Sequence, residues 1–170
     1  MKVLYDGPVH VAYFQLYVMS GGTFASDPAE SNQGQVNGLC GGALPGTLFL
    51  TTGLHTGHTH FTVELHDEQP PVDEQWEEIV EASFRPVEPE IALVEWAGEA
   101  VHHLDLPIGD YRVRYHATGM DAAAEADTVK DDDPPIDRYL LQFWPAAAQP
   151  DTIVKQTAEV AAYWHRAWKE

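Results

Sequence analysis

The stretch His58-Thr59-His60-Phe61-Thr62-Val63-Glu64-Leu65-His66 alternates between two kinds of side chain along its whole length. Side chains of a β-strand point alternately to the two faces of a sheet, so this pattern predicts a half-buried strand. On the face that we expect to meet the core lie Thr59, Phe61, Val63 and Leu65. On the outer face lie His58, His60, Thr62, Glu64 and His66.

Further strand patterns follow one another at intervals of roughly ten residues on both sides of this stretch. They cover residues 8–19, 47–52, 76–84, 91–96, 101–106, 111–117 and 138–144. Many short strands separated by turn residues are typical of mainly β proteins, so we predict an antiparallel β-sandwich or jelly-roll-like barrel. The strand over 111–117 is expected to point Tyr111, Val113 and Tyr115 inward and Arg112, Arg114 and His116 outward.

Other segments lack the strand pattern. Residues 26–46 are rich in glycine and proline, which predicts a long Gly-rich insertion with one helical turn after Asp27-Pro28. An Ala-rich helix is expected over 120–128. Residues 151–168 place apolar side chains on one stripe, which predicts a C-terminal amphipathic helix capped by Asp151. We expect a β-sandwich domain over 1–150, with the helix of 151–170 packed on it.

The chain carries 27 acidic and 9 basic residues, a formal net charge of −18. This balance argues against direct binding to nucleic acid or to an anionic membrane surface, because both need a surplus of lysine and arginine. No run of about 18 apolar residues and no signal-peptide pattern is present, so we expect a cytoplasmic protein. The single cysteine, Cys40, cannot form an internal disulfide and is predicted to be a small buried residue.

The negative charge is concentrated in residues 64–99, where Arg85 is the one base. Such a field attracts basic proteins and raises their association rates, and a tryptophan among the acids is a suitable interface anchor. The partner-binding residues predicted on this basis are Asp67, Glu68, Asp73, Glu74, Trp76, Glu77 and Glu78. The alternative is that the acids only keep the protein soluble and that Trp76 belongs to the core.

The histidines of the opening stretch allow a second hypothesis. Imidazoles on alternate strand residues point the same way and can meet one metal ion. The order of His58, His60 and Glu64 resembles the first metal-binding motif of cupins, and His66 shares their face. On this alternative the chain is a cupin-like enzyme that uses a divalent metal. The competing interpretation is that these are polar-face histidines that bind nothing.

Three segments, 11–18, 76–84 and 104–113, resemble the competence-associated DNA-entry nuclease inhibitor family in order and spacing. The resemblance covers roughly residues 9–118. It implies a small β-sandwich without enzymatic activity that binds and blocks a nuclease. The insertion at 26–46 and the extension from about 130 to 170 depart from the family pattern.

We therefore favour a non-enzymatic, cytoplasmic binding protein without a cofactor. Its acidic face would engage a basic protein partner, and the resemblance implies that this partner is a nuclease. The expected mechanism is steric and electrostatic occlusion of the basic surface. A third hypothesis, in which the insertion at 26–46 closes over a small ligand, is left open by the residues.

Overall fold

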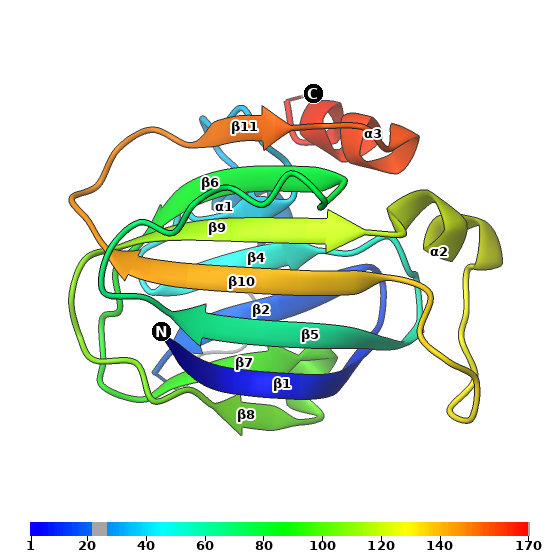
Figure 1. Cartoon of the computed structure of the whole chain (residues 1–170), viewed down its shortest axis with the longest axis horizontal. Helices are drawn as coiled ribbons and strands as arrows, with labels where there is room; N and C mark the ends of the chain where they lie inside the picture. The colour runs from blue at the N-terminus through cyan, green and yellow to red at the C-terminus, as the bar shows by residue number, and fades with distance from the viewer. Residues whose placement is uncertain (22–26, 170) are drawn as a thin grey trace.

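The structure, a computed structural model, describes residues 1–21 and 27–169 and is built mainly from two β-sheets (Figure 1). The six-stranded sheet has the order β1 (Lys2–Val11), β5 (Gly57–Leu65), β10 (Arg138–Pro145), β9 (Tyr111–Thr118), β6 (Glu78–Phe84) and β11 (Thr152–Lys155). The five-stranded sheet has the order β3 (Cys40–Gly41), β4 (Thr47–Thr51), β2 (Gln15–Ser20), β7 (Ile91–Glu95) and β8 (Val101–His103). The helices are α1 (Pro28–Ser31), α2 (Met120–Ala126) and α3 (Glu159–Ala167), with a 3₁₀ turn, η1, at Trp96–Gly98.

The main hydrophobic core draws residues from both sheets. The alternation along β5 is confirmed, because Thr59, Phe61 and Val63 are fully buried while His58, His60 and Thr62 on the other face are partly exposed. None of the helices in the described part of the chain is long and apolar enough to cross a membrane.

The prediction of one strand over 8–19 is wrong. The chain turns at Tyr13 and Phe14, whose φ angles are 55° and 63°, and the Gln15 N–H donates to the Ala12 carbonyl at 3.1 Å. The two halves, β1 and β2, lie in different sheets. Large side chains occupy both sides of the turn, so the strand pattern runs through it without a glycine or asparagine to mark the break.

The prediction of a fully antiparallel arrangement is also wrong for one pair of strands. Strand β10 pairs with β9 in antiparallel fashion but with β5 in parallel fashion, with Tyr139 opposite Phe61. The chain reaches β10 from β9 through α2 and the following loop, so β10 inserts between β9 and β5. Alternating side chains do not distinguish parallel from antiparallel neighbours.

The C-terminal helix is present but begins at Glu159, not at 151. Residues 152–155 instead form β11 on the edge of the six-stranded sheet. Asp151 caps no helix, because its carboxylate accepts the N–H groups of Val36 (3.0 Å) and Asn37 (2.8 Å). The helical turn expected at the insertion is confirmed as α1, with Asp27 as its N-cap. Residue 26, the first of the insertion, lies outside the described residues.

The outer face of β9 is also different from the prediction. Arg112, Arg114 and His116 do point away from the core, yet they are only 2%, 0% and 1% exposed. Arg114 and His116 contact residues 66–77, which cross the front of the six-stranded sheet between β5 and β6 (Figure 1), while Arg112 donates to the carbonyls of Gln149 and Pro150. We call residues 66–77 the covering segment.

Candidate functional site

The covering segment is fastened to the sheet along its length. Near its start the His66 N–H donates to the Phe143 carbonyl at 2.8 Å. In its middle the Pro70 carbonyl accepts Nη1–H of Arg114 at 2.8 Å, and near its end the Trp76 ring lies 5.4 Å from the His116 ring. The segment is therefore held at several points rather than suspended as a free loop.

Two buried arginines of β9 share one carboxylate, and one of them, Arg114, contacts the covering segment. The Glu81 carboxylate accepts Nε–H of Arg114 at 2.9 Å and Nε–H of Arg112 at 3.4 Å. The Arg114 guanidinium also lies 5.0 Å from the centre of the Trp144 ring. The carbonyls of Gln149 and Pro150 accept further hydrogen bonds from the Arg112 guanidinium. Both guanidinium groups therefore have internal partners, as buried charges require.

Burial also decides the state of His116. Removal from water lowers the pKa of this imidazole to about 4. Its Nδ1–H donates to the Leu140 carbonyl at 3.0 Å. At neutral pH the ring is therefore uncharged, and it adds no positive charge beneath the covering segment.

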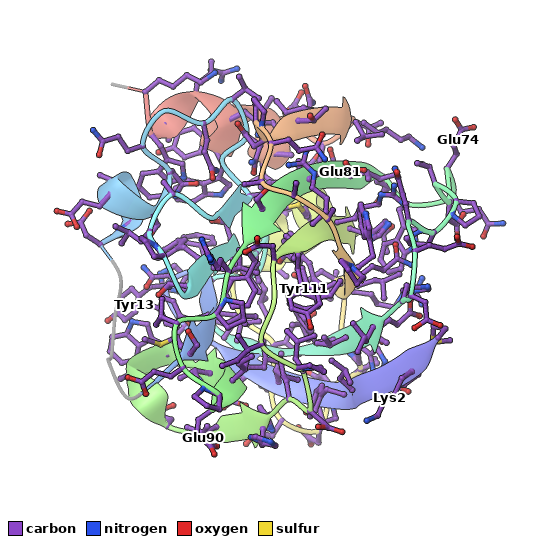
Figure 2. All side chains as sticks on the ribbon, turned by 90° about the vertical axis from the view of Figure 1, so that its left-hand side faces the viewer. Lys2, Tyr13, Glu74, Glu81, Glu90 and Tyr111 are labelled. Atoms are coloured by element: carbon purple, nitrogen blue, oxygen red, sulfur yellow. The ribbon has the colours of Figure 1, made fainter. Side chains whose placement is uncertain are left out.

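The outer side of the covering segment is acidic. Asp67, Glu68, Asp73 and Glu74 are all exposed. None of them forms an ion pair with any base of residues 1–21 and 27–169. Figure 2 shows Glu74 projecting outward at the margin of the molecule. These carboxylates remain available to a partner.

The other predicted contact residues have internal partners. Glu78 is 1% exposed, and its carboxylate accepts the N–H groups of Thr157 (2.7 Å) and Ala158 (3.0 Å) just before α3. Half-buried Trp76 lies between His116 and the Arg138 guanidinium, which is 5.3 Å from its ring. Glu78 is therefore inaccessible to a partner, and Trp76 is partly accessible.

Glu77 is exposed but also bound within the chain. Its carboxylate accepts the Gly119 N–H at 2.6 Å and the Thr118 hydroxyl at 2.7 Å. These hydrogen bonds, the Gly119 one foremost, lower the pKa of Glu77. The carboxylate is thus ionised and fixed in direction where the covering segment enters β6.

His60 of β5 and His66 just after it are bound to separate partners. His60 Nε2 lies 2.8 Å from Asp6 Oδ1, and His66 Nε2 lies 2.8 Å from Glu64 Oε2. Gln142 donates to the same Glu64 oxygen at 3.0 Å. Within the described ranges, no group of three or more His, Cys, Asp or Glu side chains is placed to hold a metal ion. His58 lies opposite His10 of β1.

The insertion contributes a buried thiol and one wall of a small pocket. Cys40 is fully buried, and burial raises the pKa of its thiol to about 12. The pocket, of about 230 Å³, lies between residues 42–45 and the start of β9. Its two charged groups, Arg85 and Asp110, already pair with each other at 3.1 Å.

The sequence pattern missed the supporting role of Arg112, Arg114 and Glu81. Alternation along β9 correctly puts the arginines on the face away from the core, but it carries no information about what covers that face. The available signal was indirect. The covering segment combines two adjacent prolines with a tryptophan, a composition that favours a packed, extended connection.

Comparisons with known proteins agree on the fold. No family model matches the chain, and no curated protein sequence matches it. The solved structure of ComJ from Bacillus subtilis, an inhibitor of the DNA degrading activity of NucA, superposes with a TM-score of 0.56 at 15% identity. That match covers 85% of this chain and 98% of ComJ. Crocagin biosynthetic gene J superposes with a TM-score of 0.54 at 14% identity, over 86% of this chain and 100% of that protein. The resemblance to the nuclease inhibitor family is therefore confirmed as a shared fold.

Proposed function

We propose that this chain is a non-enzymatic protein that inhibits a nuclease, and that the outer side of the covering segment is its contact surface. The observation that supports the proposal is the fold shared with ComJ, an inhibitor of a DNA-degrading nuclease. The exposed acids on the covering segment supply a matching chemistry, because a nuclease binds DNA phosphates through a basic surface.

The proposed mechanism is occlusion. Carboxylates of Asp67, Glu68, Asp73 and Glu74 would occupy positions that phosphates take in the basic groove, while the body of the inhibitor blocks access by DNA. The contacts of the covering segment with Arg114 and Arg138 support this mechanism, since a contact surface that is already ordered loses less entropy on binding. The net charge of −18 would speed the encounter at low salt.

The test is a DNA-degradation assay with NucA and a panel of basic nucleases from the organism that makes this chain. We expect near-stoichiometric inhibition of at least one of them. A variant with Asp67→Asn, Glu68→Gln, Asp73→Asn and Glu74→Gln should need at least about tenfold more protein for half inhibition.

The matched control neutralises the same number of exposed acids elsewhere, with Glu125→Gln, Asp131→Asn, Asp132→Asn and Asp133→Asn. We expect this control to inhibit almost as well as the parent. Equal losses in both variants would show that total charge and not the covering segment matters. No inhibition of any nuclease by the parent would contradict the proposed function itself.

A further inference from the structure

Backbone strain in this protein is concentrated at one place. Among the described residues, four that are not glycine have φ in the left-handed region: Tyr13 (55°), Phe14 (63°), Ala97 (58°) and Asp127 (66°). A β-carbon makes this conformation unfavourable, so residues with large side chains rarely adopt it. Such strain is characteristic of functional sites, where the surrounding structure holds it in place.

Contacts connect the segments that carry these residues to His55, Thr56 and Trp96. The Phe14 N–H donates to the His55 carbonyl at 3.2 Å, and the Thr56 N–H donates to the Asp127 carbonyl at 3.2 Å. The Tyr13 ring lies 5.0 Å from the Trp96 ring, next to Ala97. Segments distant in sequence are therefore connected close to their strained residues.

The same place presents aromatic rings to solvent. Tyr13 is 55% exposed, and Trp96 is partly exposed. The His55 ring packs against both Tyr13 (5.3 Å) and Phe14 (4.8 Å), and Trp164 of α3 supports Phe14 from behind at 5.6 Å. We call Tyr13, Phe14, His55 and Trp96 the aromatic tip.

A two-residue turn between strands normally takes Asn-Gly or a similar pair, because both central residues need positive φ. Here the pair is Tyr13-Phe14. Phe14 contributes to packing through Trp164, but the largely exposed Tyr13 ring gains little burial in return for its backbone conformation. A role in binding accounts for a large aromatic residue at this position.

The aromatic tip is separate from the covering segment. Figure 2 shows Tyr13 and Glu74 on opposite sides of the molecule. No residue belongs to both surfaces. A partner bound at the aromatic tip would therefore leave the covering segment free.

Charge indicates which kind of side chain the aromatic tip would bind. Two exposed acidic residues join the backbone near the aromatic tip: the Glu99 N–H donates to the Trp96 carbonyl at 3.3 Å, and the Asp127 carbonyl accepts the Thr56 N–H at 3.2 Å. Their negative charge raises the attraction of this region for a cation. The exposed faces of Tyr and Trp rings attract guanidinium groups. The chain itself makes such pairs twice, with Arg114 over Trp144 and Arg138 over Trp76.

We propose that the aromatic tip is a second protein-binding surface, which takes an arginine side chain of a basic partner on the exposed faces of Tyr13 and Trp96. The strained turn would hold the Tyr13 ring in the orientation that this contact needs. The proposal is independent of nuclease inhibition, since it concerns another face of the molecule.

The test is an NMR titration of the full chain with the peptide N-acetyl-Gly-Arg-Gly-amide at low salt. We expect saturable shifts of the Trp96 indole N–H and of the Tyr13 and Phe14 amides. The same peptide with citrulline, which keeps the shape of arginine without its charge, should bind at least about fivefold more weakly. Equal binding of both peptides, or arginine-dependent shifts confined to residues 66–77, would overturn the proposal.

A variant separates binding from folding. Asn tolerates the left-handed conformation, so Tyr13→Asn should keep the thermal midpoint at or above that of the parent. It should lower the affinity for the arginine peptide about tenfold. Tyr163→Asn, at a residue of nearly equal exposure (54%) on α3, should leave the affinity unchanged. Equal loss in both variants would overturn the proposal, as would dimerisation of the parent that Tyr13→Asn abolishes.

Discussion

Replacing Glu81 by alanine should strongly destabilise the protein, because it leaves two buried arginines without their carboxylate. The side chains of Arg114 and Arg112 are 0% and 3% exposed, and that of Glu81 is 13% exposed. Breaking a buried ion pair by removing one partner typically costs about 3–5 kcal/mol. For a chain of this size that loss lowers the thermal midpoint by roughly 6–20 °C.

The assay is urea unfolding followed by tryptophan fluorescence, with thermal melts in parallel. The control is Asp110→Ala, which breaks the ion pair with Arg85 (3.1 Å) that is exposed on both sides and should cost less than about 1 kcal/mol. The double variant Glu81→Leu/Arg114→Met should recover part of the loss, because it also removes the Arg114 charge, whereas Arg112 keeps its charge and its neutral carbonyl partners. A cost below about 1 kcal/mol for Glu81→Ala would refute the claim that the buried Arg112 and Arg114 depend on this carboxylate.

Three further predictions follow from the interior. Burial lowers the pKa of His116 and His165 to about 4, so the unfolded chain binds more protons between about pH 6.5 and 4. The free energy of unfolding should therefore be highest above pH 6.5 and should fall by on the order of 1–2 kcal/mol per histidine by pH 5. A urea midpoint that does not change from about pH 7 to 5 would contradict this. The Cys40 thiol should not react with a disulfide reagent until the protein is unfolded in urea, so rapid native-state labelling would disprove its burial. Gly38→Ala would place a β-carbon 1.9 Å from the Trp164 carbonyl oxygen, which should destabilise the packing of α3 by about 1–3 kcal/mol. We therefore expect α3 to become sensitive to proteolysis. A variant as resistant to proteolysis as the parent would contradict the close packing of Gly38 against α3.

Local patterns predicted the strands well where one face meets the core. Alternation in β5 and β9 correctly separates the core side from the outer side, because the period of a strand is fixed by its backbone. The same patterns could not show that residues 66–77 cover Arg114, since that contact joins positions far apart in sequence.

Other predictions were wrong where a residue is compatible with two types of secondary structure. Tyr13 and Phe14 have strong strand preferences, so nothing local marks the turn between β1 and β2. Ile153 lies on the apolar stripe of a hypothetical helix but pairs with Val80 at the sheet edge. The exposed acids of the candidate site were visible in the composition, whereas the burial of Glu78 depends on its contact with the N–H groups before α3.

Hydrogen–deuterium exchange on the chain with and without an inhibited nuclease tests the central proposal most directly. If the outer side of the covering segment is the contact surface, amides of residues 66–77 gain protection in the complex, while those of the acidic loop at 131–133 do not. Exchange over 66–77 that is unchanged in a fully inhibited complex would contradict the account.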